Sequence, residues 1–160
     1  MRLGILADSH DKLARLGHAI ELLQAAGAEA LVHCGDLTSP PIVEALSALP
    51  AWFVLGNNDP ALPLERAAEA SGVVCLGRGG VVELAGKRVG VTHGHIGSEV
   101  RRVLAARPDY LLSGHSHAAS DGMSGAVRRI NPGALHRAGE FTVALLEVET
   151  GEVRFIPVPR

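Results

Sequence analysis

The chain has 160 residues, 47% of them apolar and 20% charged, so its size and composition are those of one globular domain with a substantial core. This composition excludes a disordered or collagen-like protein. The formal charge of −2 provides no global basic field for nucleic acid or an anionic membrane, and an aromatic share of 3% disfavours base stacking on single strands.

The N-terminal half alternates predicted strands with predicted helices. Apolar runs predict strands at residues 2–7, 30–33 and 51–55. The first helix is expected to start near Lys12 with Asp11 as its cap, and to end at Gly27. A second helix is predicted after Ser39, with two prolines in its first turn. The segment 60–71 is predicted to be a loop with one short helix.

The second half changes to predicted hairpins. The tripeptide Ala85-Gly86-Lys87 separates the apolar runs 81–84 and 88–92 and predicts a tight turn. A helix is predicted at 97–107, and further strands at 110–113, 127–130, 141–148 and 152–157. Strand–helix repeats followed by hairpins predict one domain over residues 1–160, an α/β fold of two packed sheets flanked by helices.

Polar side chains follow five of the predicted strands, at the point where each strand ends. The motifs are Asp8-Ser9-His10, Gly35-Asp36, Gly56-Asn57-Asn58-Asp59, His93-Gly94-His95 and Gly114-His115-Ser116-His117. A single Asp or His at a strand end is commonly a turn former, but five such motifs in one short chain are not explained that way. Ligands bind beyond the carboxyl ends of strands in open α/β sheets, so the motifs predict a site at one sheet edge.

The residue types in these motifs favour a divalent metal. Carboxylate, amide oxygen and imidazole without thiolate suit Mn²⁺, Fe²⁺, Zn²⁺ or Ni²⁺. Alternate side chains of an extended segment share a side, so Asp8 with His10, and His115 with His117, are each predicted to point the same way. One zinc ion needs only three or four ligands, and seven candidates therefore favour two metals joined by one carboxylate.

The motifs Asp-x-His, Gly-Asp, Gly-Asn-x-Asp, His-Gly-His and Gly-His-x-His, in this order, resemble those of the calcineurin-like metallophosphoesterases. Within that family the chain is similar to small single-domain bacterial and archaeal phosphodiesterases, and to the metallophosphoesterase-like subunit of the eukaryotic retromer complex. The resemblance runs from residue 8 to 117, and the segment Ile130-Asn131-Pro132-Gly133 extends it. It implies a four-layer αββα sandwich of two mixed β-sheets flanked by helices.

The resemblance also assigns roles to the motif residues. It implies that one metal is held by Asp8, His10 and His117, that a second is held by Asn57, His93 and His115, and that Asp36 bridges the two. The implied cofactors are two divalent ions, Mn in the first place, with Zn, Fe or Ni as alternatives. The implied reaction is hydrolysis of a small phosphodiester by a hydroxide that bridges the two metals.

The residue after the ligand Asn departs from the pattern of many relatives. They carry a His there, which stabilises the transition state or protonates the leaving oxygen, whereas this chain has Asn58. An amide supplies no proton, so we predict that water or His95 protonates the leaving group and that activated diesters are preferred. The catalytic candidates are thus Asn58 and His95, with a merely positioning role as the alternative for His95. Asp59 is expected to brace its loop by hydrogen bonds.

Other residues are expected to have structural roles. His18, His33 and His136 lie outside the motifs. Arg128 and Arg129 are expected on a solvated face, with contact to substrate phosphate as the alternative. The segment Asn131-Pro132-Gly133 is expected to form a turn that supports the metal loops, and Cys34 is expected in the core.

Two other classes of function stay open. The first is a protein-binding scaffold that has lost catalysis, as the retromer relative is described. The second is a nuclease, which the acidic charge and scarce aromatics disfavour, so a nucleic-acid polymer is not the expected partner. A monoesterase is also compatible with the motifs.

Two cysteines without CxxC spacing, and no apolar run of membrane-spanning length, predict a cytoplasmic protein without a membrane partner. A homo-oligomer is compatible with the resemblance.

Overall fold

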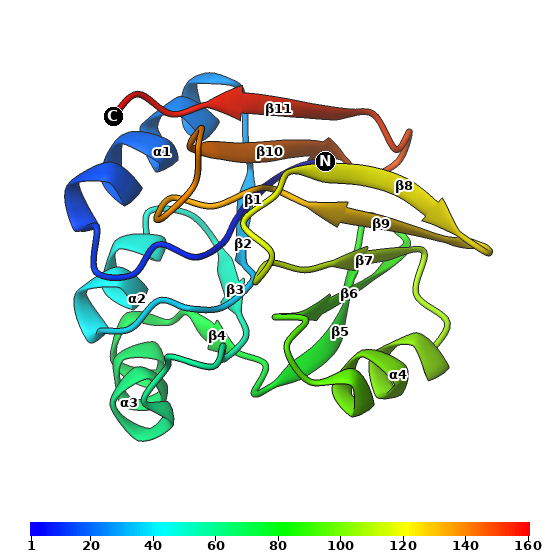
Figure 1. The fold of residues 1–160 in the computed structure, drawn as a ribbon, viewed down its shortest axis with the longest axis horizontal. Helices are drawn as coiled ribbons and strands as arrows, with labels where there is room; N and C mark the ends of the chain where they lie inside the picture. The colour runs from blue at the N-terminus through cyan, green and yellow to red at the C-terminus, as the bar shows by residue number, and fades with distance from the viewer.

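The computed structural model describes residues 1–160 and contains eleven strands in two sheets, with four helices (Figure 1). The first sheet has the order β11-β10-β1-β2-β3-β4 and the second the order β5-β6-β7-β9-β8. The strands of the first sheet are β1 (Arg2–Leu6), β2 (Ala30–His33), β3 (Ala51–Phe53), β4 (Val74–Cys75), β10 (Thr142–Glu147) and β11 (Val153–Pro157). Those of the second are β5 (Gly79–Leu84), β6 (Lys87–Thr92), β7 (Tyr110–Leu112), β8 (Ser120–Ser124) and β9 (Val127–Asn131). The helices are α1 (Leu13–Ala25), α2 (Pro40–Leu46), α3 (Ala61–Ser71) and α4 (Gly97–Ala105).

Both sheets mix parallel and antiparallel pairs. Strands β1 to β4 pair in parallel, whereas β10 and β11 are antiparallel additions at the β1 side. In the second sheet β6, β7 and β9 pair in parallel, and β5 and β8 close its two edges antiparallel. The carboxyl ends of the parallel strands therefore share an edge within each sheet, which is where the polar motifs follow them.

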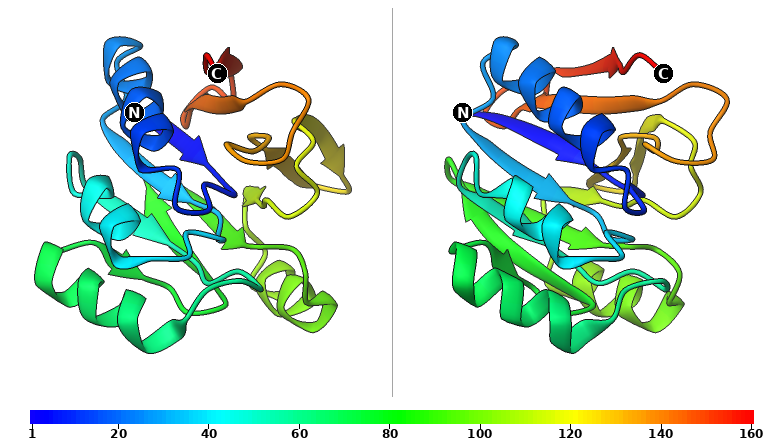
Figure 2. Two further views of the ribbon diagram at one scale, coloured as in Figure 1. Left: turned by 60° about the vertical axis from the view of Figure 1, so that its left-hand side comes forward. Right: turned by 90° about the vertical axis from the view of Figure 1, so that its left-hand side faces the viewer.

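Two apolar cores divide the molecule into four layers. Helices α1, α2 and α3 bury Leu16, Ile42 and Leu64 in the same core, on the outer face of the first sheet. The right-hand view of Figure 2 shows these blue, cyan and green helices in front of that sheet. Ile5 of β1 and Val91 of β6 belong to the second core, which lies between the two sheets. Helix α4 packs against β5 and β6, so the predicted αββα sandwich of two mixed sheets is confirmed.

Three local predictions were wrong. Lys12, not Asp11, occupies the N-cap position of α1, and no side chain caps that helix. Asp11 has a φ of 55°, because backbone bonds from His10 and Asp11 to the carbonyls of Asp36 and Leu37 bend this loop. The segment 60–71 is almost entirely the helix α3. Strand β8, which is exposed along its whole length, was not predicted because its sequence has no apolar alternation.

None of the four helices reaches the length and apolarity needed to span a bilayer, and the longest, α1, has 13 residues.

Candidate metal centre

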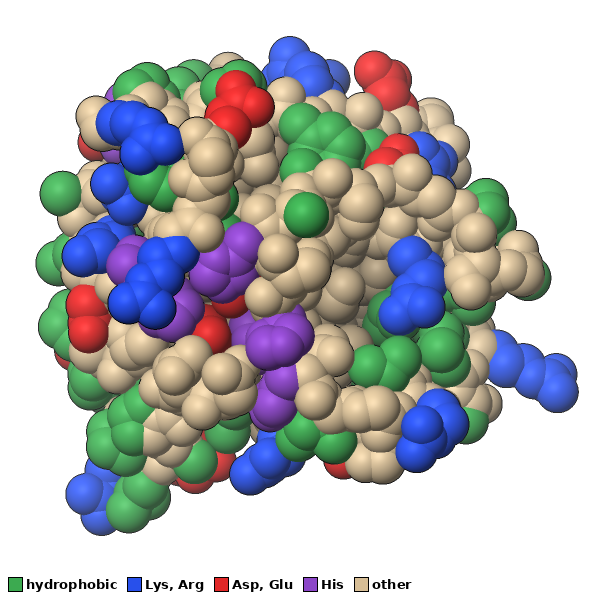
Figure 3. Space-filling model, viewed as in Figure 1, with side chains coloured by type: hydrophobic (Ala, Val, Ile, Leu, Met, Phe, Trp, Pro, Cys, Tyr) green, Lys and Arg blue, Asp and Glu red, His purple; other side chains and the backbone are tan.

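The predicted site residues converge from both sheets. Asp8, Asp36 and Asn57 follow the parallel strands β1, β2 and β3 of the first sheet. His93 follows β6, and His115 follows β7, in the second sheet. Figure 3 shows histidine side chains gathered on one face of the molecule, with Lys or Arg side chains beside them. The packing of the two sheets thus joins two sets of strand ends into one cluster.

The loops that carry these residues have an unusual backbone conformation. Five of the seven metal-ligand candidates have a positive φ although they are not glycine: Asp8 (52°), His10 (41°), Asp36 (60°), His115 (69°) and His117 (59°). Such angles cost free energy in an L-residue and cluster at functional sites. The extended conformation expected for these segments is therefore wrong, because left-handed turns set the side-chain directions. Asp8 and His10 nevertheless point to one place, as predicted.

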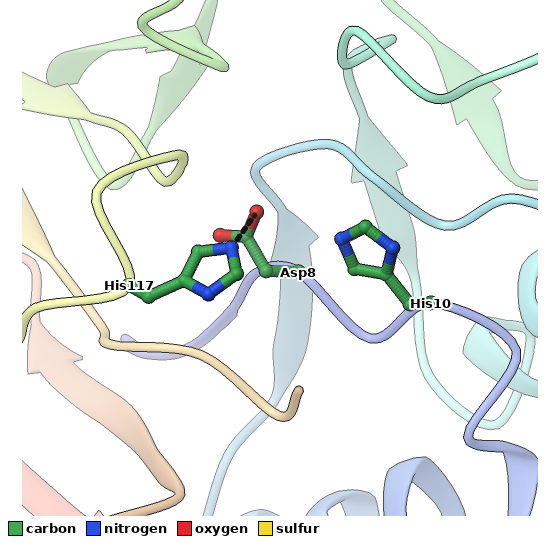
Figure 4. A group of neighbouring side chains, drawn as sticks. All are labelled: Asp8, His10 and His117. Atoms are coloured by element: carbon green, nitrogen blue, oxygen red, sulfur yellow. Dashed lines mark ion pairs between the residues drawn. The ribbon is translucent and has the colours of Figure 1, made fainter. Parts of the chain in front are cut away.

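A first group comprises Asp8, His10 and His117, whose ligand atoms all lie within 4.8 Å of one another (Figure 4). His117 Nε2 is 3.2 Å from Asp8 Oδ1. The other ring nitrogen of His117, Nδ1, lies 3.2 Å from the carbonyl oxygen of Arg137 and donates its hydrogen to it. That bond fixes the tautomer and leaves Nε2 free to act as a ligand.

A second group comprises Asp8, Asp36 and His93, all of them buried. His93 Nδ1 lies 2.8 Å from the carbonyl oxygen of Cys34 and donates its hydrogen there. Its Nε2 therefore faces oxygen atoms, with Asn57 Oδ1 at 3.0 Å and Asp36 Oδ2 at 3.5 Å. An imidazole nitrogen directed at oxygen atoms, with the other ring nitrogen bonded to a backbone carbonyl, has the arrangement of a metal ligand.

The remaining contacts link the two groups. Asp36 Oδ2 lies 3.2 Å from His10 Nε2 in the first group as well as close to His93 in the second. The ring of His115 is 5.1 Å from that of His93, centroid to centroid. His117 thus belongs to the first group, whereas His115 lies beside His93 of the second. Asp8 is a member of both groups, and Asp36 of the second group also approaches His10 of the first.

The donor set fits divalent ions. Asp8 Oδ1 and His10 Nε2 are buried atoms without a hydrogen-bond partner, and their close contacts lack hydrogen-bond geometry. A buried polar atom without a partner is costly unless something else satisfies it. Carboxylate oxygens, imidazole nitrogens and the Asn57 amide oxygen, directed at common points, are ligands that Mn²⁺, Fe²⁺, Zn²⁺ and Ni²⁺ accept.

Burial and close neighbours shift the pKa values of the groups in the centre. Burial raises the pKa of the Asp8 carboxyl, and the nearby His93 and His117 only partly offset that effect. Burial also acts to raise the pKa of Asp36, but hydrogen bonding to His93 and Asn58 outweighs it and holds that pKa well below the usual range. The pKa of His93 is raised, because interaction with Asp36 outweighs the burial that would lower it. The centre thus holds Asp36 as an anion that strongly attracts cations.

The two catalytic candidates lie at this centre. Asn58 donates two hydrogen bonds to Asp36, from its backbone nitrogen to Oδ1 at 2.9 Å and from Nδ2 to Oδ2 at 2.8 Å. The His95 ring lies 5.2 Å from that of His93 and 6.0 Å from that of His115. Its Nδ1 is buried without a partner, and burial together with the neighbouring imidazoles lowers the pKa of His95.

Supporting residues hold the loops in place. Asp59 accepts hydrogen bonds from the backbone nitrogens of Asp36, Thr38 and Gly56 at 2.7–2.8 Å, which confirms its predicted bracing role. The Asn131 amide donates to the Gly114 carbonyl at 2.9 Å and to Ser116 Oγ at 3.0 Å, as expected of a turn that supports the metal loops.

Two histidines expected to be structural lie closer to the centre than the sequence indicated. The His136 ring is 4.7 Å from that of His10, and His33 Nε2 is 2.9 Å from Ser9 Oγ. His136 lies outside the strand-end motifs, and no sequence signal pointed to it. His33 ends β2 just before the Gly35-Asp36 motif, and that position was the available signal. His18 lies exposed on α1, as expected. Cys34 is buried in the core between the sheets, which confirms its predicted place.

Comparison with known proteins identifies the family and the fold. A family model described as the calcineurin-like phosphoesterase superfamily domain matches residues 1–151. A phosphodiesterase of Methanocaldococcus jannaschii is 28% identical over 167 residues, which cover 98% of each chain. The solved structure of an archaeal phosphodiesterase has a TM-score of 0.88 at 27% identity, over 99% of this chain and 100% of that one. Wild-type Vps29 of Entamoeba histolytica, solved with zinc, has a TM-score of 0.62 at 20% identity over 99% and 98% of the two chains, a likeness of fold alone.

Proposed function

Because this chain belongs to the calcineurin-like phosphoesterase superfamily, we propose that it is a metal-dependent phosphodiesterase acting on small phosphodiesters. The observation that carries the proposal is the position of Asp36, whose Oδ2 is 3.2 Å from His10 Nε2 and 3.5 Å from His93 Nε2. A carboxylate between two sets of imidazoles is suited to join two metal ions. The relative named a phosphodiesterase aligns over nearly the whole of both chains, which supports the same activity.

We propose that two divalent ions bind, manganese in the first place. The ligands of one would be Asp8, His10 and His117, those of the other Asn57, His93 and His115, with Asp36 shared. When bound, such ions would neutralise phosphate charge and would supply a hydroxide by lowering the pKa of a bound water. Zn, Fe and Ni are accepted by the same donor set, so the choice of manganese is part of the proposal.

The chain's own residues orient and hold the site. Asn58 keeps the Asp36 carboxylate in place through two hydrogen bonds. His95, with its unpartnered Nδ1 beside His93 and His115, is the group we propose to contact the leaving oxygen. Most of the rate enhancement in this arrangement comes from positioning and from stabilising charge that develops on the phosphoryl oxygens.

The deciding experiment is hydrolysis of bis-p-nitrophenyl phosphate by chelator-treated protein, with and without added Mn²⁺. We expect metal-dependent turnover of the diester that is weak on p-nitrophenyl phosphate and is lost in His93→Ala. The matched control is His18→Ala, since His18 is exposed on α1 and should leave the rate unchanged. Turnover without added metal, or retained in His93→Ala, contradicts the proposal.

Three rival functions have distinct outcomes in phosphoester assays. A scaffold without catalysis binds Mn²⁺ but turns over no phosphoester, and the observation that favours it is the engagement of the Asn58 amide with Asp36 where relatives carry a proton donor. A nuclease cleaves oligonucleotides with a rate that falls steeply with salt, because it must grip a polyanion. A monoesterase prefers p-nitrophenyl phosphate to the diester.

A further inference from the structure

A cavity of about 460 Å³ opens beside His115, on the outer face of the second sheet. Its walls come from α4, from the hairpin of β8 and β9, and from the loops that carry His93 and His115. Cavities of roughly 300–1,000 Å³ hold small-molecule ligands. This β8–β9 cavity is therefore large enough for a substituent of nucleoside size attached to a phosphate at the metal centre.

One unpaired cation lines the cavity. The neighbouring arginines of β9 differ in their contacts, because Arg128 binds Asp121 through two hydrogen bonds of 2.8 Å, whereas Arg129 forms no ion pair or hydrogen bond through its side chain. Asp121 is the only carboxylate in the wall, and its charge is offset by Arg128. Arg129 thus supplies the net charge of the β8–β9 cavity.

The rest of the wall leaves room beside that charge. Gly122 of β8 pairs with Arg129 across the hairpin, and a Cβ there would meet nothing within 4 Å. The hydroxyls of Ser113 and Ser120 make no hydrogen bond within the protein. Val100 of α4 adds an apolar residue to the wall. These groups together offer a ligand one positive charge, free hydroxyls and an apolar contact.

We propose that the β8–β9 cavity binds the organic substituent of the phosphodiester, and that Arg129 selects a substituent carrying a second negative charge, such as a further phosphate. The inference rests on the proposed function, because it assumes that the scissile phosphate binds at the centre beside His115. An arginine without an acidic partner retains its full capacity for paired hydrogen bonds to phosphate. Arg129 is thereby a specificity-determining residue for the diester.

The test uses two matched substrates and two matched ligands. Thymidine 5′-(p-nitrophenyl phosphate) is compared with the same compound carrying a 3′-phosphate, so that only the second anionic group differs. Binding of thymidine 3′,5′-bisphosphate and of thymidine 5′-phosphate is measured by calorimetry on the Mn²⁺-loaded protein. The variant is Arg129→Gln and its control is Arg66→Gln, an exposed arginine on α3 that lies outside the cavity.

We expect the second phosphate to improve both kcat/KM and affinity about tenfold in the native protein, as a hydrogen-bonded charge pair typically does. Arg129→Gln should abolish that gain, whereas Arg66→Gln should keep it. An equal preference for both compounds in the native protein overturns the inference while leaving the phosphodiesterase intact. If no diester is hydrolysed, the proposed function is overturned instead. Calorimetric binding of the two thymidine phosphates then still decides the role of Arg129.

Discussion

The side-chain amide of Asn58 donates a hydrogen bond to Oδ2 of Asp36 at 2.8 Å, while the backbone nitrogen of Asn58 donates to Oδ1 of the same carboxylate at 2.9 Å. Both oxygens of Asp36 are thus held by one residue. The sequence alone presented Asn58 as a weak substitute for a catalytic histidine. The contacts favour a different role, in which Asn58 acts through the carboxylate as a positioning residue.

Asn58→Ala should therefore impair metal binding as well as turnover. Loss of a group that orients a metal ligand typically costs about 10–100-fold in metal affinity or activity. The measurement is the Mn²⁺ concentration that gives half-maximal hydrolysis of bis-p-nitrophenyl phosphate, together with kcat at saturating Mn²⁺. A variant with reduced kcat but an unchanged requirement for Mn²⁺ would show that Asn58 acts on the substrate and not through Asp36.

His95→Ala should make the rate depend more steeply on the leaving group. A donor at the leaving oxygen matters most for poor leaving groups, since a stable aryl oxide departs without a proton. The experiment compares kcat/KM for methyl aryl phosphates whose phenols range from p-nitrophenol to unsubstituted phenol. Equal slopes for the native protein and the variant would assign His95 a role away from the leaving group.

Asp8→Asn should stabilise the chelator-treated protein at pH 8 and abolish its response to metal. Burial raises the pKa of the Asp8 carboxyl, so folding with the charged form is unfavourable at that pH, and an amide removes this penalty. In the native protein Mn²⁺ should raise the Tm in a concentration-dependent way, because a ligand that binds only the folded state stabilises it. Thermal unfolding with and without Mn²⁺ checks both effects, and a variant whose Tm still rises with Mn²⁺ contradicts the ligand role.

His33 should make the protein less stable in acid, because it takes up a proton more readily in the unfolded chain than in the folded one. Burial, reinforced by the charge of His93, lowers the pKa of His33 to about 3, whereas the unfolded chain takes up the proton near 6.5. The unfolded state therefore binds more protons between these values, and stability falls by up to about 1.4 kcal/mol per pH unit as the pH drops below 6.5. Urea unfolding between pH 7.5 and 5 should show a shallower acid dependence in His33→Gln than in the native protein. His18→Gln, at an exposed position, is the control and should keep the native slope.

Gly114→Ala should damage the centre through sterics alone. A Cβ at this position would lie 2.7 Å from Asp8 Oδ2 and 2.8 Å from the Cβ of Ala7. Asp8 Oδ2 accepts the backbone hydrogen bond of His115, so a shift of Asp8 also moves a second ligand candidate. We expect a loss of about 1–3 kcal/mol in unfolding free energy and a loss of the Mn²⁺ response. Gly17→Ala, within α1 and with open space around the new Cβ, should instead add about 0.5–1 kcal/mol.

Local sequence patterns were sufficient to predict most of the elements and the chemistry of the strand ends. Strand β2 and helix α2 were predicted with their observed starts, because a buried apolar run and a proline-led first turn are local signals. The order and spacing of the polar motifs, which are also local, were enough to indicate the family. Where the local signal was absent, as in the polar strand β8, the prediction failed.

The way in which the motif residues meet depends on contacts between distant parts of the chain. His93 and Asp36 are distant in the chain, and the packing of the two sheets brings them to 3.5 Å. The left-handed backbone of Asp8 and His10 is unfavourable for an isolated segment and is held by bonds to the neighbouring strand loop, so no local pattern predicts it. The difference between the paired Arg128 and the unpaired Arg129 depends on Asp121 across the hairpin. Local patterns set which elements form, whereas contacts between residues far apart in the chain set side-chain direction and charge pairing.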